Sequence, residues 1–152
     1  MKVGVISDTH DNVEKITEAV RILNNNAVEF VFHCGDFVAP FSLEPLKDLK
    51  CEWLGVFGNN DGEKEGLLEK SGNRIKTAPF FIEMDSRKIG LIHKNAELDA
   101  DIVLFGHSHK YQEKREGNKL ILNPGEVCGW LFGRSSLVIL DLKSLTHQVL
   151  YF

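Results

Sequence analysis

The sequence has few cysteines and no long apolar segment, and each of these two features excludes a class of protein. Its three cysteines (Cys34, Cys51 and Cys128) are an odd number, lie far apart and form no CxxC pair, so a disulfide framework is not expected. The first apolar run ends at Asp8, which makes it too short for a signal peptide or a membrane span. We therefore expect a protein of the reducing cytoplasm with no membrane association.

An excess of positive charge is also absent. The chain has 18 Lys and Arg against 22 Asp and Glu, a net charge of −4, so no strong electrostatic footprint for nucleic acid is expected. A nucleotide substrate stays compatible with this charge, because bound divalent cations would supply positive charge locally. The length of 152 residues, without repeats or a flexible linker, predicts a single domain over residues 1–152.

The spacing of apolar residues predicts an α/β first half and a β-rich second half. Strands at 2–7, 28–33 and 53–57 alternate with a helix that begins near Val13 and another within 40–49, an order that favours parallel strands with right-handed crossovers. Later strands are predicted at 80–84, 88–93, 102–105, 119–122, 137–140 and 147–151. The pattern therefore predicts an α/β fold of two facing sheets, with fewer helices on the second.

Residue types that bind metals recur where the predicted strands end. The five segments are Asp8-Thr9-His10, Gly35-Asp36, Gly58-Asn59, His93 and Gly106-His107-Ser108-His109. Ligand sites in open α/β sheets lie at the carboxyl ends of the strands, so these side chains are expected to meet. Each segment alone has an ordinary explanation, such as a turn, a helix cap or a half-buried histidine. All of these ordinary explanations would have to hold at once, so a shared ligand site is the better interpretation.

The chemistry of this set points to two metal ions. Carboxylate, imidazole and amide ligands without a thiolate suit Mn²⁺, Fe²⁺, Zn²⁺, Ni²⁺ or Co²⁺. Seven groups are too many for one ion but suit two ions that share a carboxylate. Two such ions can bind both the attacking and the leaving oxygen of a displacement at phosphorus, and they provide hydroxide at neutral pH.

The ordered motifs D-x-H, G-D, G-N, H and G-H-x-H resemble those of the calcineurin-like metallophosphoesterase superfamily. Gly58-Asn59-Asn60-Asp61 and Asn123-Pro124-Gly125-Glu126 are similar to its compact prokaryotic phosphodiesterase branch. The resemblance implies a sandwich of two facing mixed β-sheets flanked by helices. It also implies a first metal on Asp8, His10 and His109, a second on Asn59, His93 and His107, and Asp36 bridging the two.

From this resemblance we expect a metal-dependent phosphodiesterase that acts on a small phosphodiester or nucleotide. Hydroxide bridging two divalent metals would attack phosphorus, with Asp36, Asn60 and His93 as the catalytic residues. Mn²⁺ is the first choice of cofactor, and Ni²⁺, Fe²⁺, Zn²⁺ and Co²⁺ are alternatives. Two other functions stay open: a catalytically weak scaffold for protein contacts, and a phosphomonoesterase. The seven filled ligand positions favour catalysis over the scaffold.

Three residues depart from the motif of many family members. Asn60 and Ala39 replace a histidine that acts on the leaving group and the aspartate that orients it, so substrates with good leaving groups are expected. Asn60 would then either contact a phosphoryl oxygen or serve as a left-handed turn residue. Lys94 replaces a glycine after His93, and it would either contact substrate phosphate or be a solvated loop residue.

Two further segments carry expectations. Only eight residues, 94–101, separate His93 from the next strand, which is short for a parallel crossover; an exposed face of the second sheet would follow, and with it a possible homodimer. The glycine-spaced segment 125–133 would be either a packed loop or a substrate rim, with Trp130 or Phe132 stacking on an aromatic group. His33 and His147 lie within apolar strands and are expected to be structural.

Overall fold

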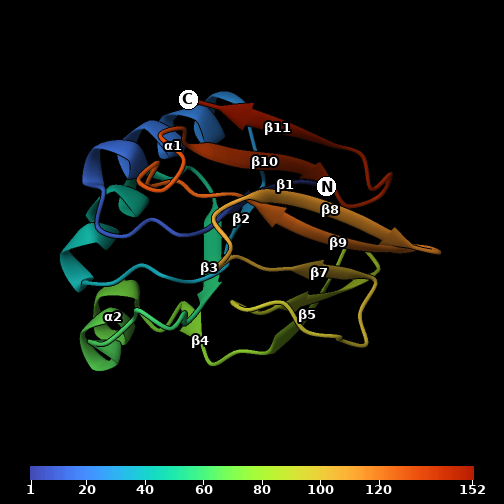
Figure 1. Cartoon of the computed structure of the whole chain (residues 1–152), viewed down its shortest axis with the longest axis horizontal. Helices are drawn as coiled ribbons and strands as arrows, with labels where there is room; N and C mark the ends of the chain where they lie inside the picture. Colours follow the sequence, from blue (N-terminus) through green and yellow to red (C-terminus); the bar gives the residue numbers. More distant parts are fainter.

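Two mixed β-sheets face each other, and the helices cover only one of them (Figure 1). The structure is a computed structural model that describes residues 1–152. The first sheet has the order β11-β10-β1-β2-β3-β4 and the second has the order β5-β6-β7-β9-β8. This confirms the predicted α/β fold class with two facing mixed sheets.

The strands of the first sheet are β1 (Lys2–Ile6), β2 (Phe30–His33), β3 (Glu52–Val56), β4 (Ile75–Lys76), β10 (Ser136–Asp141) and β11 (His147–Tyr151). Those of the second sheet are β5 (Phe80–Met84), β6 (Arg87–Leu91), β7 (Ile102–Leu104), β8 (Tyr111–Glu116) and β9 (Lys119–Pro124). The helices are α1 (Val13–Asn25), the 3₁₀ helix η1 (Pro40–Asp48) and α2 (Lys64–Ser71).

The period of two residues in β1 explains how the layers pack. Val3 and Val5 are fully buried against the second sheet, where Ile89 and Leu104 belong to the same apolar cluster. Ile6 belongs to a separate cluster formed with the helices. Because alternate side chains of a strand point to opposite faces, β1 lies at the centre of three layers. The apolar clusters on the two faces of the first sheet therefore fix the position of the C-terminal end of β1.

Parallel pairing brings the ends of the central strands to one edge. β1 pairs in parallel with β2, and β2 with β3, while β6 pairs in parallel with β7 in the other sheet. The His107 amide donates to Asp8 Oδ2 at 3.1 Å, and the Val127 amide donates to Ser7 O at 3.0 Å. These bonds join the second half of the chain to the end of β1.

The crossover between β6 and β7 contains no helix. The two strands are parallel neighbours, and the connecting segment follows the outer face of the second sheet. Leu98 is buried there, and a Cβ atom on Gly90 would lie 2.9 Å from Leu98 Cδ1. Gly90 thus leaves room for Leu98 to pack directly on the sheet. Leu98 covers the position that a crossover helix would otherwise cover, so a short connection suffices. A homodimer through this face stays a prediction.

Three elements were not predicted: β4, β8 and α2. The side chains of β8 beyond Tyr111 are all exposed, so its sequence lacks the apolar alternation that marks a half-buried strand. Helix α2 buries only Leu67 and Ser71, which is too few positions to give a helical period. Pro45 lies inside η1 and has no amide hydrogen to donate, in keeping with a 3₁₀ rather than an α-helix.

None of the helices combines the length and apolar character needed to cross a membrane. All three cysteines are free.

Candidate metal centre

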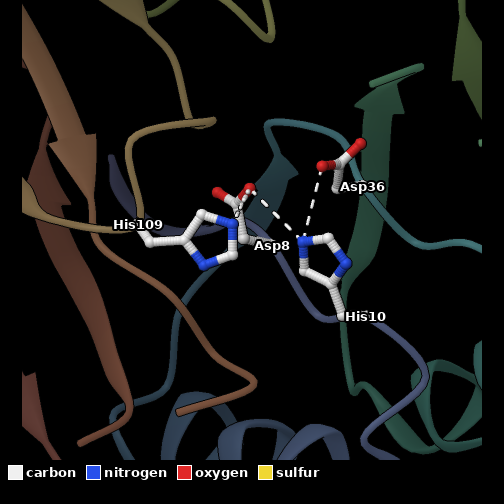
Figure 2. Close-up of side chains that lie close together, drawn as sticks. All are labelled: Asp8, His10, Asp36 and His109. Carbon is white, nitrogen blue, oxygen red and sulfur yellow. Dashed lines mark ion pairs between the residues drawn. The ribbon is translucent and has the colours of Figure 1, made fainter. Parts of the chain in front are cut away.

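Three side chains from different strand ends converge around Asp8 (Figure 2). His10 Nε2 lies 3.8 Å from Asp8 Oδ1, and His109 Nε2 lies 3.4 Å from the same oxygen. Asp36 completes the group, with Oδ2 at 3.4 Å from His10 Nε2. One ligand atom from each of these four residues lies within 4.8 Å of the others.

Two of the ligand atoms in this group lack the hydrogen-bond partners that buried polar atoms normally have. Asp8 Oδ1 and His10 Nε2 are buried, and neither has a hydrogen-bond partner, a situation that costs about 1–3 kcal/mol for each group. Metal–ligand bonds of about 2.0–2.2 Å place ligand atoms on one ion roughly 3–3.5 Å apart, close to the spacing seen here. The residues therefore fit a divalent cation.

A second set of donors lies on the other side of Asp36. Asn59 Oδ1 lies 3.0 Å from His93 Nε2 and 2.9 Å from His107 Nδ1. The same Asp36 oxygen that faces His10 lies 3.3 Å from His93 Nε2, so it lies between the two sets. Asn59 and His107 are exposed whereas Asp8 and Asp36 are buried, and the second set is therefore the one that opens to solvent.

Asn60 is exposed, but it also makes hydrogen bonds to Asp36. Its side-chain amide donates to Asp36 Oδ2 at 2.7 Å, and its backbone amide donates to Oδ1 at 2.9 Å. Asn60 is not among the residues with a positive φ, so the interpretation as a left-handed turn residue is wrong. In this structure Asn60 fixes the orientation of the carboxylate at the centre of the site.

Five of the seven predicted ligands have left-handed backbone conformations. They are Asp8 (φ 53°), His10 (39°), Asp36 (61°), His107 (67°) and His109 (61°). Positive φ is uncommon for residues other than glycine and costs about 1–3 kcal/mol where it is strained. The hydrogen bonds that fix these loops hold the ligands in place, among them those from the Asp8 amide to Gly35 O and from the His10 amide to Asp36 O.

Two buried carboxylates that support the site were not predicted as site residues. Asp61 accepts from the backbone amides of Asp36, Val38 and Gly58, and it thereby joins the loops that follow β2 and β3. Glu126 Oε2 lies 2.6 Å from His109 Nδ1. Both occur in the quoted motifs, but a sequence does not reveal which donors a buried carboxylate will meet.

The remaining predicted residues lie near the site in different ways. Lys94 is exposed and makes no hydrogen bond or ion pair, so no contact assigns it a role. The Trp130 ring is exposed, and its centroid lies 6.2 Å from that of His10. His33 is fully buried, stacks on Phe37 at 3.7 Å, and has its pKa lowered to about 3 by burial. It is therefore a neutral, structural histidine.

Neighbouring carboxylates raise the pKa of two of the histidines that are predicted ligands. Asp8, and then Asp36, raise the pKa of His10 above 6.5. For His93, burial lowers the pKa, but Asp36 and the carbonyl of Cys34 outweigh burial and raise it. Burial likewise opposes ionisation of Asp36, yet the hydrogen bonds from His93 and Asn60 hold its pKa well below 3.8. Protons and a metal ion would therefore compete for the same ring nitrogens and carboxylate oxygens.

Metal affinity should therefore rise with pH. Below their raised pKa values His10 and His93 carry protons that an ion must displace, so the apparent affinity should increase by up to about tenfold per pH unit for each displaced proton. The increase should extend above pH 6.5 and level off once both rings are neutral. Calorimetric titration with Mn²⁺ in buffers of different ionisation enthalpy would count the released protons. Binding without proton release at pH 6 would contradict this assignment.

The fold and the site together define an α/β protein with candidate metal ligands at one edge between its two sheets. Residues 1–145 match the family model of the calcineurin-like phosphoesterase superfamily domain, and the chain belongs to this family. Phosphodiesterase MJ0936 of Methanocaldococcus jannaschii is 36% identical over 97% of both chains. The probable metallophosphoesterase YsnB of Bacillus subtilis is 29% identical over 84% of this chain and 75% of its own.

Solved structures agree with this assignment. An archaeal phosphodiesterase superimposes with a TM-score of 0.92 over the whole of both chains at 32% identity. Vps29 of Entamoeba histolytica superimposes with a TM-score of 0.73 over 100% of this chain and 99% of its own, at 21% identity. The second likeness concerns the fold alone, while the first extends to a chain of similar sequence throughout.

Proposed function

We propose that this chain, as one metallophosphoesterase domain, is a metal-dependent hydrolase of small phosphodiesters or nucleotides. The observation that carries the proposal is the position of Asp36 Oδ2, at 3.4 Å from His10 Nε2 and 3.3 Å from His93 Nε2, between two sets of donors. The relatives named phosphodiesterase support the choice of a diester over a monoester. The three unpaired cysteines are compatible with a cytoplasmic location.

In this proposal Asp8, His10 and His109 would hold one ion, Asn59, His93 and His107 would hold another, and Asp36 would serve both. When bound, two divalent cations supply Lewis acidity and a hydroxide nucleophile at neutral pH. Mn²⁺ is the expected ion and Ni²⁺, Fe²⁺, Zn²⁺ or Co²⁺ are alternatives, because the donor set is of oxygen and nitrogen.

The protein's own groups orient the ligands. His93 Nδ1 lies 2.8 Å from the carbonyl oxygen of Cys34, which accepts the ring hydrogen and leaves the Nε2 lone pair free for a metal. Asn60 donates two hydrogen bonds to Asp36 and keeps both of its oxygens in place. The exposed Asn59 and His107 lie where a phosphodiester would approach.

Nothing at position 60 can protonate a leaving group, because the Asn60 amide is not an acid. General acid catalysis typically contributes 10²–10⁴-fold. We therefore expect aryl phosphodiesters, whose leaving groups are stable anions, to be hydrolysed at least about 100-fold faster than alkyl phosphates.

An assay with Mn²⁺ or Ni²⁺ tests both the metal-dependent hydrolysis and the preference for aryl phosphodiesters. The substrates are an aryl phosphodiester, an aryl monoester, an alkyl monoester and a cyclic nucleotide, and the variant is His107→Ala. The variant should lose at least about 90% of the metal-dependent rate, because an imidazole ligand is removed. The matched control is His147→Ala, a histidine bound to the Tyr111 hydroxyl at 2.8 Å, and it should keep the wild-type rate.

Three results would separate the alternatives. No turnover with any metal would favour a scaffold. Faster hydrolysis of the aryl monoester than of the diester would favour a phosphomonoesterase. Equal rates for wild type and His107→Ala would exclude the proposed site, whichever substrate is preferred.

A further inference from the structure

Glu126 is a buried carboxylate that contacts the proposed site without belonging to it. It lies just beyond β9 and is 1% exposed. Its Oε2 faces His109 Nδ1 at 2.6 Å, and its Oε1 accepts from the Phe132 amide at 2.8 Å. The Leu131 amide lies 3.1 and 3.2 Å from the two oxygens, and Cys128 Sγ lies 3.2 Å from Oε2. Four donors thus converge on one side chain.

We propose that Glu126 is a positioning residue that links metal binding by His109 to the order of the aromatic loop, defined here as residues 129–133. This inference rests on the proposed function, because it takes His109 as a metal ligand. It assigns to the loop the role of a surface for the aromatic or apolar part of a phosphodiester.

The contact with His109 decides which ring nitrogen is free. A carboxylate can only accept, so His109 must hold its hydrogen on Nδ1. The lone pair of Nε2 then faces Asp8 Oδ1, 3.4 Å away, where the ion is expected. Outer partners of this kind fix the tautomer and the ring orientation of a ligand, and their loss typically costs 10–100-fold in metal affinity.

The contact with the loop replaces the packing that the loop lacks. Trp130, Leu131 and Phe132 are 63%, 65% and 50% exposed, so burial of their side chains contributes little to holding them. The flanking Gly129 and Gly133 have φ values of 69° and 66°, which glycine adopts without strain. The two amide hydrogen bonds to Glu126 are therefore the main polar anchor of the tip.

The loop lies on the side of the site where a substrate's organic group could reach it. Trp130 lies near His10, and Lys110 Nζ lies 5.0 Å from the centroid of the Phe132 ring. Aromatic faces and a nearby ammonium suit a phosphate ester with an aromatic substituent. This arrangement names the substrate class as a phosphodiester with an aryl or nucleobase group.

Only a carboxylate satisfies all four donors. In Glu126→Gln the amide nitrogen would face either His109 Nδ1 or the amides of Leu131 and Phe132. In the first case His109 must move its hydrogen to Nε2 and can no longer bind a metal there. In the second case two backbone donors of the loop meet another donor. Metal affinity and loop order are thus predicted to depend on the same charged group, and such coupling is reciprocal.

Two measurements on the 152-residue chain test the link, each made for wild type, Glu126→Gln and Glu126→Asp. Calorimetry with Mn²⁺ should give an affinity 10–100-fold lower for the glutamine variant and a smaller loss for aspartate, which keeps the charge. Hydrogen exchange followed by mass spectrometry should show slower exchange of segment 129–133 when Mn²⁺ is added to wild type. In Glu126→Gln this protection should be absent.

Glu83→Gln is the matched control, because Glu83 is exposed on β5, and it should behave as wild type in both measurements. If wild type binds none of Mn²⁺, Ni²⁺, Fe²⁺, Zn²⁺ and Co²⁺, the proposed function fails together with this inference. If Glu126→Gln binds as tightly as wild type, this inference alone is overturned. It is also overturned if affinity falls while exchange in 129–133 does not respond to metal in wild type. Should the glutamine variant fail to fold, full affinity in Glu126→Asp with an unprotected loop would overturn it.

Discussion

Asp36→Asn is expected to lower the rate of aryl phosphodiester hydrolysis by at least about 100-fold while the chain stays folded. Loss of a residue that only supports a metal ligand typically lowers metal affinity or activity 10–100-fold. Asp36 lies between both proposed ligand sets, so its loss should have at least as large an effect. The substitution changes one atom and leaves the side-chain volume nearly the same, so the effect would come from hydrogen bonding and charge.

The surroundings of Asp36 leave no acceptable place for an amide nitrogen. At the position of Oδ2 it would face the Asn60 side-chain amide, a donor 2.7 Å away. At the position of Oδ1 it would face the backbone amide of Asn60 at 2.9 Å. In either orientation donors meet donors, and the charge that two cations would share is lost.

The rate and the number of bound metal ions per chain should be measured together for this variant. Both are expected to fall, whereas Asp99→Asn, which removes an exposed carboxylate paired with Lys88, should change neither. A wild-type rate in Asp36→Asn would exclude a bridging role for this carboxylate. A reduced rate with full metal content would instead place Asp36 on the substrate side of the site.

Gly106→Ala is expected to abolish metal binding, although it adds a single methyl group. The new Cβ would overlap Ser7 Oγ and lie 2.7 Å from Asp8 Oδ2, and both of these residues are fully buried. The backbone of Gly106 cannot move away easily, since its amide donates to His93 O and its carbonyl accepts from the Asn123 side chain. Displacement of Asp8 is therefore the expected response.

Overpacking of this kind typically costs 1–3 kcal/mol of stability. Thermal unfolding of the metal-free protein and titration with Mn²⁺ would measure both consequences. Gly62→Ala is the control, because a Cβ at that position has no neighbour within 4 Å, and it should leave stability and metal affinity close to wild type. Tight metal binding by Gly106→Ala would show that β7 and β1 do not need to approach so closely.

The strands that carry the site could be predicted because each is an apolar run that ends in a polar ligand. Val3 and Val5 in β1, or Ile102 to Leu104 in β7, are buried on account of their own side chains, and the sequence displays that property directly. Strand β8 could not be predicted in this way. It is held by pairing with β9 at the edge of its sheet, and backbone pairing leaves no mark in side-chain polarity.

The same distinction applies to the candidate site. The side chains of Asp8, His10 and His109 are placed by strand ends, so the order of motifs was enough to group them. The roles of Asp61 and Glu126 depend on amides from distant segments, such as Gly58 and Phe132, and these partners exist only once the chain has folded. Asn60 was identified as a site residue, but its contact with Asp36 was not foreseen for the same reason.

The left-handed backbone at Asp8, His10, Asp36, His107 and His109 sets stability against the proposed metal binding at the same positions. Glycine would adopt these conformations with less strain, so the backbone alone would favour a residue that has no ligand to offer. A chain selected for stability alone would be expected to lose its functional groups at these positions. The aspartates and histidines at these positions are thus the places where, under the proposed function, stability is given up for a site that an ion can occupy.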